Sequence, residues 1–205
     1  DVKPGDLVSL NVQSTAQPLA RALVRETFAV GATPLLSMTY PEYEEDLLEV
    51  APDSYFDSEP TFELNEIRQI DAWVRVRSPE NTRALQNADK SRMARLMKRN
   101  RPVQDIRLNE TRWLGTIYPS NALAQDADMS LDEYRRFAFD AMFLFDDDPV
   151  ARWREQEEYQ KRLVDALAAA DEVAHDPAAP QTETEERYAR PDADRLPDHV
   201  LDEHA

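Results

Sequence analysis

The sequence contains no cysteine, three glycines and three histidines among its 205 residues. Without cysteine it cannot form disulfide bonds, thiolate-ligated zinc sites, iron–sulfur centres or a thiol nucleophile. The histidines, His175, His199 and His204, all lie close to the C-terminus. Residues 1–170 therefore cannot assemble a serine or cysteine nucleophile that is activated by histidine.

The scarcity of glycine and the lack of long apolar runs exclude further classes of protein. The loop after the first expected strand, residues 13–18, has no glycine, whereas dinucleotide-binding and Walker A loops need glycine for close backbone approach to phosphate. No stretch approaches the roughly 20 apolar residues of a membrane-spanning helix, and residues 1–6 do not resemble a signal peptide. We therefore expect a cytoplasmic protein that binds neither nucleotides nor a membrane.

Lysine is also scarce, because only four of the 24 basic residues are lysines, while 41 residues are acidic and the net charge is -17. This surplus of negative charge repels phosphate, so we expect no nucleic acid as a main partner. An acidic surface with arginine in place of lysine favours a halophilic, haloarchaeal protein over an ordinary acidic one, since high salt screens the self-repulsion.

What is present is a regular alternation of strand and helix patterns. We expect strands at residues 7–12, 34–40, 73–77 and 113–118, and helices at residues 18–30, 42–50, 62–72, 78–100 and 130–145. A last helix is expected to start at Pro149 and to run through Trp153 to residue 170. Gly31 is expected to cap the first helix, Ser78 with Pro79 to open the fourth, and Ser130 with Glu133 to form a capping box for the fifth. Residues 51–61 are expected to form a loop.

This order of elements predicts the fold class. Strands that alternate with crossover helices must run parallel. We therefore predict an α/β fold with a mostly parallel sheet and Rossmann-like layering over residues 1–170. Residues 171–205 hold eleven acids and three arginines with little apolar periodicity. Since ordering a backbone costs about 1–2 kcal/mol per residue, we predict that this acidic, proline-containing segment is a disordered tail.

Three groups of residues carry functional interest. Asp146, Asp147 and Asp148 suggest a cation site, but consecutive carboxylates do not converge on one ion, and Pro149 makes Asp148 a good N-cap. Trp73 and Trp113 are expected to anchor a core or an interface. The third group, the basic cluster, resembles an RNA or acidic-peptide site but lacks aromatic residues, so we expect it to face neighbouring carboxylates or a partner domain. It comprises Lys90, Arg92, Arg95, Lys98, Arg99 and Arg101.

Four segments resemble, in order and spacing, the N-terminal half of the thermophilic aminopeptidase family, the dinuclear metallopeptidases of the aminopeptidase T and aminopeptidase S type. They are VKPGDLV (residues 2–8), PLARALVRETFAVGATP (18–34), IDAWVRVRSPENTRAL (70–85) and TRWLGTIYPSNALAQDADMSLDEYRRF (111–137). With DDDPVARW at residues 146–153, the resemblance extends over residues 1–171.

The resemblance implies a usually homodimeric enzyme with two divalent metal ions, chosen from cobalt, zinc, manganese and magnesium. Such an enzyme removes N-terminal residues from peptides with metal-bound water as the nucleophile. The family's metal ligands belong to its C-terminal half, and none has a matching position here. The resemblance therefore implies no catalytic, cofactor-binding or metal-binding residue in this chain, an absent catalytic domain, and an inactive protein on its own.

The sequence departs from the family after Val173, where a further strand is expected and an acidic segment follows instead. Together with the start at Asp1, this predicts a truncated gene product, a frame-shifted one or a functional solo domain. Two alternatives to the non-catalytic half of a peptidase stay open. One is a free-standing protein-interaction module that uses the basic cluster or residues 118–124, and the other is small-ligand binding at the carboxyl ends of the strands.

Overall fold

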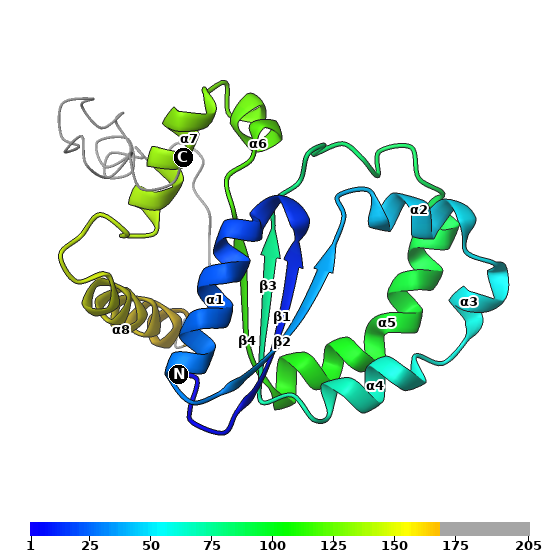
Figure 1. The fold of residues 1–205 in the computed structure, drawn as a ribbon, viewed down its shortest axis with the longest axis horizontal. Coiled ribbons are helices and arrows are strands. Elements are labelled where there is room, and N and C mark those ends of the chain that lie inside the picture. Colours follow the sequence, from blue (N-terminus) through cyan, green and yellow to red (C-terminus); the bar gives the residue numbers. More distant parts are fainter. Residues whose placement is uncertain (169–205) are drawn as a thin grey trace. The chain divides into compact units, whose positions relative to one another are not determined.

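The computed structural model describes residues 1–168 (Figure 1). The chain divides into two compact units, Asp1–Arg135 and Arg136–Ala205. The predicted tail and its three histidines lie outside the described residues. Within residues 1–168, no helix is both long and apolar enough to cross a membrane.

The first unit is built on a four-stranded sheet with the order β2-β1-β3-β4. Its strands are β1 (Leu7–Gln13), β2 (Thr33–Thr39), β3 (Ala72–Arg77) and β4 (Arg112–Ile117). Every pair is parallel, which confirms the predicted α/β class. Since β2 and β3 lie on opposite sides of β1, the direction of strand succession reverses between β1 and β3.

Helices cover both sides of this sheet. α1 lies on one side and the helices α2 to α5 lie on the other (Figure 1). The short 3-10 turn η1 (Ser14–Ala16) precedes α1. The helices of the first unit are α1 (Gln17–Ala29), α2 (Tyr43–Val50), α3 (Asp53–Asp57), α4 (Thr61–Ile67), α5 (Lys90–Glu110) and α6 (Asn121–Asp126). α7 (Leu131–Ala141) follows, and α8 (Pro149–Ala168) belongs to the second unit.

The main core lies between α1 and the sheet. Val8, Leu10 and Val12 alternate along β1 and are almost fully buried, together with Val76 of β3 and Ala20 of α1. Alternate residues of a strand point to the same side. The predicted strand pattern of β1 therefore identifies the side that α1 covers. A second core cluster joins α2, α3 and α5 through Leu48, Phe56 and Leu96.

The end of α1 confirms the predicted glycine cap. Gly31 has φ +78° and donates its N–H to the carbonyl of Phe28 at 2.9 Å. Residues with a Cβ rarely adopt this left-handed conformation, so glycine ends the helix at low energetic cost. The carbonyl of Gly31 in turn accepts the N–H of Gly5 at 2.8 Å, which ties the turn before β1 to the end of α1.

The turn before β1 is also bound to the far edge of the sheet by Asp6. Its carboxylate accepts the backbone N–H of Lys3 at 2.6 Å and pairs with the Arg112 guanidinium at 2.8 Å. These two contacts stabilise the charged form and hold the pKa of the Asp6 carboxyl below its usual value.

The predicted start of the long fourth helix at Ser78 is wrong. α5 begins twelve residues later, at Lys90, where the Asp89 carboxylate accepts the N–H groups of Ser91 at 2.7 Å and Arg92 at 3.2 Å. Asp89, and not Ser78, is therefore the N-cap of this helix. The backbone of Ser78 is instead held by side chains from the end of β1, as described below.

Other element boundaries differ from the sequence expectation in detail. The expected loop at residues 51–61 contains α3, and the expected helix at residues 62–72 ends at Ile67. The expected helix at residues 130–145 ends at Ala141, after which Phe143 adopts φ 60°. α6 was not predicted at all.

Two predicted helix caps are confirmed. Ser130 donates its backbone N–H to the Glu133 carboxylate at 2.9 Å, and the N–H of Glu133 reaches the Ser130 hydroxyl at 3.3 Å, which is the expected capping box. In the second unit, the Asp148 carboxylate accepts the N–H of Ala151 at 3.0 Å and so caps α8.

The described part of the second unit is held together by aromatic contacts within residues 136–168. The ring of Trp153 packs edge-on against Phe143 at 5.3 Å and donates its indole N–H to the Met142 carbonyl at 3.1 Å. Arg152 lies 5.1 Å from the Phe143 ring and pairs with Asp146 at 2.9 Å. These contacts fix the turn between α7 and α8.

Candidate functional site

Ligands of open α/β sheets bind outside the carboxyl ends of the strands, at the point where the strand order reverses. In this sheet, that point is the gap between the ends of β1 and β3. It is spanned by two hydrogen bonds from the end of β1 and the following turn η1: the Gln13 side-chain oxygen accepts the N–H of Ser78 at 2.5 Å, and the Thr15 hydroxyl donates to the Ser78 carbonyl at 2.5 Å. Ser78 is only 1% exposed.

The neighbouring strand end is closed in the same way. The Ser120 hydroxyl, which follows β4, donates to the carbonyl of Pro79 at 2.6 Å and caps α6 by accepting the N–H of Leu123 at 3.4 Å. The carboxyl edge is thus fastened by side chains that consume backbone groups, and its loops lack the glycines that a phosphate cradle needs.

A polar hollow of about 260 Å³ lies beside this edge. Its lining residues come from the segment after β3 and from α6: Glu80, Asn81, Thr82, Arg83, Ala122, Gln125 and Asp126. The hollow offers carboxylate, amide and guanidinium groups to a small polar ligand, but the lining contains no histidine and no nucleophile paired with a base.

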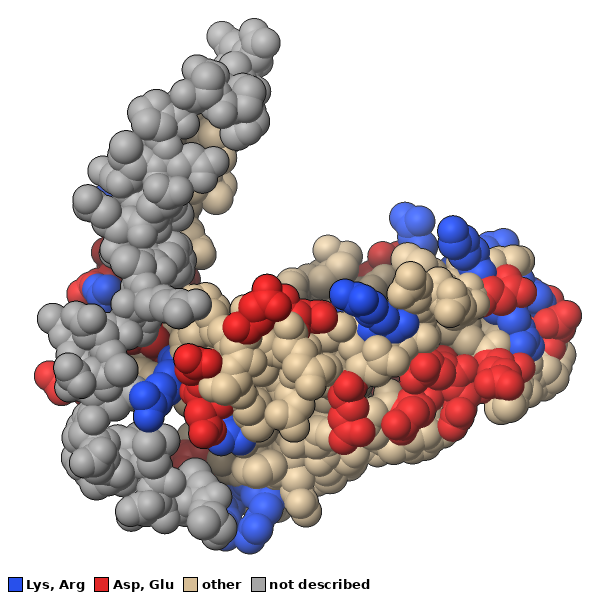
Figure 2. All heavy atoms as spheres, turned by 90° about the horizontal axis from the view of Figure 1, so that it is seen from above, with Lys and Arg blue, Asp and Glu red and all other residues tan. Residues whose placement is uncertain are grey.

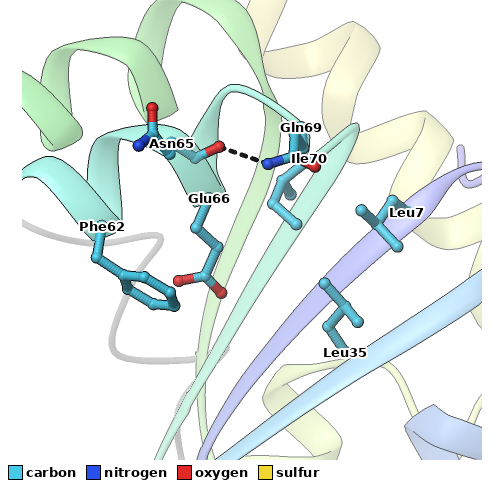
Figure 3. A pocket seen from close by; sticks show the side chains of 7 residues that line it. All are labelled: Leu7, Leu35, Phe62, Asn65, Glu66, Gln69 and Ile70. Carbon is cyan, nitrogen blue, oxygen red and sulfur yellow. Dashed lines mark hydrogen bonds between the residues drawn. The ribbon is translucent and has the colours of Figure 1, made fainter.

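A second hollow, of about 190 Å³, lies at the amino end of the sheet between α4 and the strands β1 and β2. Figure 3 shows Leu7 and Leu35 of the sheet opposite Phe62, Glu66 and Ile70, with Glu66 the single charged group. The Gln69 amide at its rim donates to the Asn65 carbonyl at 2.8 Å. Its mainly apolar lining suits a hydrophobic side chain better than a catalytic reaction.

The sequence predicted no metal-binding residue, and the described residues supply no donor set for one. Within residues 1–168, no three His, Asp or Glu side chains come together in a group that could hold a metal ion. The three consecutive aspartates are used locally, since Asp146 pairs with Arg152 and Asp148 caps α8. His175, His199 and His204 lie outside the described residues.

The basic cluster on α5 faces carboxylates and aromatic rings of its own unit, as predicted. Arg95 pairs with Asp57 at 2.7 Å and with Asp53 at 3.3 Å. Arg99 pairs with Glu63 at 2.9 Å, and its side chain is 6% exposed.

Arg92 donates to three carbonyls at the end of α2, including that of Leu48 at 2.6 Å, and lies 4.8 Å from the Phe56 ring. Lys and Arg side chains gather with acidic ones at the end of the molecule that carries α2, α3 and α5 (Figure 2). Three of the six cations in the basic cluster therefore hold α5 to α2, α3 and α4.

A second set of arginines, which the sequence analysis did not single out, lies on the side of the sheet opposite α1. Trp73, Arg75 and Arg77 alternate along β3 and so point to this side. In the strand register, Arg75 has Asn11 beside it on β1 and Gly115 beside it on β4.

The amino-terminal part of this face is covered by α5. The Arg107 guanidinium lies 4.4 Å from the ring of Trp73 and 6.0 Å from the ring of Trp113. Burial, with a smaller contribution from the charge of Arg75, lowers the pKa of Arg107. Trp73 is thus a packing anchor, as expected, whereas Trp113 is 51% exposed at the edge of the sheet.

The carboxyl-terminal part of this face, which we call the arginine face, is open. It consists of Asn11, Ser37, Arg75, Arg77, Gly115 and the adjoining Arg107. A Cβ atom added to Gly115 would meet no atom within 4 Å. Neither Arg75, Arg77 nor Arg107 has a carboxylate partner within 4.0 Å in residues 1–168.

Comparison with known proteins gives a family and a fold. The family model described as thermophilic metalloprotease (M29) matches residues 1–183. Among solved structures, wild-type AmpT from Thermus thermophilus superimposes with a TM-score of 0.60 and 18% sequence identity. That match covers 81% of this chain but 44% of the AmpT chain, so this chain spans less than half the length of that structure. A search of curated proteins found no match.

Proposed function

The chain belongs to the thermophilic metalloprotease (M29) family, and from this membership we propose that it is the N-terminal, non-catalytic portion of a metal-dependent aminopeptidase. In the intact architecture, the enzyme removes N-terminal residues from peptides, and this portion contributes a wall of the substrate cavity. On its own the chain is inactive.

One observation carries this proposal: the family match extends over residues 1–183, yet the described residues bring together no donor set for a metal ion. A dinuclear site needs several carboxylate and imidazole ligands around each metal. The two metal ions of the family therefore do not fit the residues described here, and no reaction step is assigned to them.

The proposal is tested with the purified chain and a leucine p-nitroanilide reporter, in the presence of cobalt, zinc, manganese or magnesium. We expect no metal-stimulated release, because residues 1–168 bring together no group of ligands that could hold a metal ion and its activated water. A full-length family member serves as the positive control, and cooperative urea unfolding shows that the inactive chain is folded. Turnover that requires metal and is abolished by a chelator would refute the proposal.

A second candidate function is favoured by the two outer strands of the sheet, β2 and β4, each of which pairs with a single strand within residues 1–168. β2 and β4 carry exposed apolar side chains at positions 35, 36, 38, 113, 114 and 117. Unpaired apolar edges readily accept another strand or surface. The chain could thus serve as a free-standing interaction module that pairs with a separate catalytic chain. Co-purification of a stoichiometric partner from the native host supports this function, and a chain that stays alone there contradicts it.

Three further properties belong to the proposal. We expect a cytoplasmic homodimer, as is usual for the family, and we expect folding to be favoured by high salt because the net charge is -17. Sedimentation analysis at low and at molar salt tests the dimer and the salt dependence, since a monomer at every concentration contradicts the dimer.

A further inference from the structure

We propose that the arginine face binds carboxylate groups of a partner polypeptide, namely the portion of the metallopeptidase that lies beyond this chain. This inference rests on the proposed function only where it identifies the partner as the rest of the peptidase. That the ligand is a carboxylate follows from the residues of the arginine face.

The first step concerns unpaired positive charge on an acidic protein. The sequence has 41 acidic and 24 basic residues, so carboxylates outnumber the cations. On α5, Arg95 and Arg99 each have a carboxylate within 3.0 Å. Arg75 and Arg77 are neighbours on one side of β3, Arg107 lies near Arg75, and none of the three has such a partner in the described part of the chain. Their charges are therefore available to carboxylates from outside.

The second step concerns the exposure of the face. Arg75 and Arg77 are exposed, and the residues beside them are short or lack a side chain: Asn11, Ser37 and Gly115. This leaves a low, polar surface with guanidinium groups standing above it. Arg107 at its border is half-buried, and its Nε atom has no hydrogen-bond partner among residues 1–168.

The third step identifies the ligand as a carboxylate on a polypeptide. Guanidinium groups bind carboxylates through two parallel hydrogen bonds. Nucleic acid would bring many phosphates towards a chain of net charge -17 and be repelled elsewhere. Exposed Trp113 and Ile117 point to the same side of the sheet as Arg75 and Arg77. Tryptophan and arginine are enriched among the residues that contribute most to protein interfaces.

The strand geometry also sets the spacing of the ligand groups. Arg75 and Arg77 are two residues apart on one strand, so their Cα atoms are separated by about 6.6 Å. Alternate side chains of an extended peptide have the same spacing. An extended segment with acids at every second position therefore presents carboxylates at the interval of the two guanidinium groups.

The test uses the full chain and a synthetic peptide, acetyl-Glu-Thr-Glu-Thr-Glu-amide, observed through backbone amide shifts in NMR. We expect shifts confined to the amides around Asn11, Ser37, Arg75 and Gly115. The matched peptide with Gln in place of each Glu should bind about tenfold more weakly or less, because it lacks the charge-assisted hydrogen bonds.

Protein variants provide the matched control. The double substitution R75Q/R77Q should weaken binding of the Glu peptide by at least about tenfold. The double substitution R21Q/R25Q removes two exposed arginines of α1 on the other side of the sheet and should leave binding unchanged. Urea unfolding of both variants verifies that they are folded.

Several results would overturn the inference. These are equal binding of the Glu and Gln peptides, shifts centred on the basic cluster of α5, or unchanged affinity of R75Q/R77Q. Concentration-dependent shifts of the same amides without peptide would assign the face to a second copy, and tighter binding of single-stranded oligonucleotide would assign it to phosphate. If the chain has no peptidase activity and does not bind the Glu peptide, this inference alone is refuted. If the chain has peptidase activity and binds the Glu peptide, only the proposed function is refuted.

Discussion

The pairing of Arg99 with Glu63 provides a direct test of whether the basic cluster holds the fold together. The Arg99 guanidinium lies 2.9 Å from the Glu63 carboxylate and 4.4 Å from the Tyr55 ring, and the side chain is 6% exposed. In Arg99→Met, the apolar stem and the helix propensity are retained while the charge is removed. A hydrogen bond to a charged group contributes about 1.5–3 kcal/mol, so we expect the free energy of unfolding to fall by about 2 kcal/mol.

Arg101 is the matched control, because it lies two residues further along the same helix and its ion pair with Asp105 is exposed and 4.0 Å long. Arg101→Met should change the free energy of unfolding by less than about 0.5 kcal/mol. Urea unfolding followed by tryptophan fluorescence measures both variants. Adding Glu63→Gln completes a double-mutant cycle with Arg99→Met.

The salt dependence separates the two arginines further. At about 1 M salt the Debye length is about 3 Å, so any small effect of Arg101→Met should disappear while most of the effect of Arg99→Met remains. Equal losses in the two variants, or additive effects of Arg99→Met and Glu63→Gln, would refute the conclusion that buried pairing to α4 is what the cluster provides.

Three further predictions follow from local contacts. Asp148→Ala should reduce the free energy of unfolding of α8 and its surroundings by about 1 kcal/mol through loss of the cap, measured by amide hydrogen exchange. Gly31→Ala, at φ +78°, should lower the free energy of unfolding by about 1 kcal/mol or more, whereas Gly115→Ala, which meets open space, should change it little in the same urea assay. Because the pKa of the Asp6 carboxyl is lowered in the folded state, the charged carboxylate stabilises the fold above the unfolded pKa, and this stabilisation is lost as the pH falls through the folded pKa. Asp6→Asn should therefore be less stable than wild type at pH 7. In urea titrations, the difference between the two proteins should shrink below about pH 4.

The strands were predictable because their signals are local. Each is a short apolar run next to a proline, glycine or polar turn, and each observed strand begins or ends within one residue of the expected range. The parallel order also follows from sequence, since each strand is separated from the next by at least one helix. These signals predict the α/β class and the parallel direction of the strands, but they do not predict the strand order β2-β1-β3-β4.

The error at Ser78 shows where local reasoning fails. Ser followed by Pro satisfies the sequence rule for a helix start, but Gln13 and Thr15, more than 60 residues earlier, bind both backbone groups of Ser78. Tertiary hydrogen bonds thus override a local cap signal. α3 escaped prediction for a related reason: it has five residues, and it is held by arginines of α5 that lie about 40 residues later.

The arginine face could not be found from the sequence for a different reason. The alternation of Trp73, Arg75 and Arg77 indicates that one side of β3 is polar, and this much is visible in the sequence. Whether that side is covered depends on how far α5 extends over the sheet. The structure shows that Arg107 covers Trp73, while beside Arg75 the side of the sheet at Gly115 is open.

The closed and open surfaces of the first unit lie on different parts of the sheet. The carboxyl edge, where an α/β sheet usually binds its ligand, is fastened by Gln13, Thr15 and Ser120 through hydrogen bonds to loop backbone. These three side chains are therefore occupied by the loops and are not available to a ligand. The polar hollow beside this edge keeps Glu80, Arg83 and Asp126 available, and the arginine face offers guanidiniums, which can bind a carboxylate but cannot act as a base or hold a cation. Under the proposed function, the reacting groups come from the portion of the peptidase that the arginine face recognises.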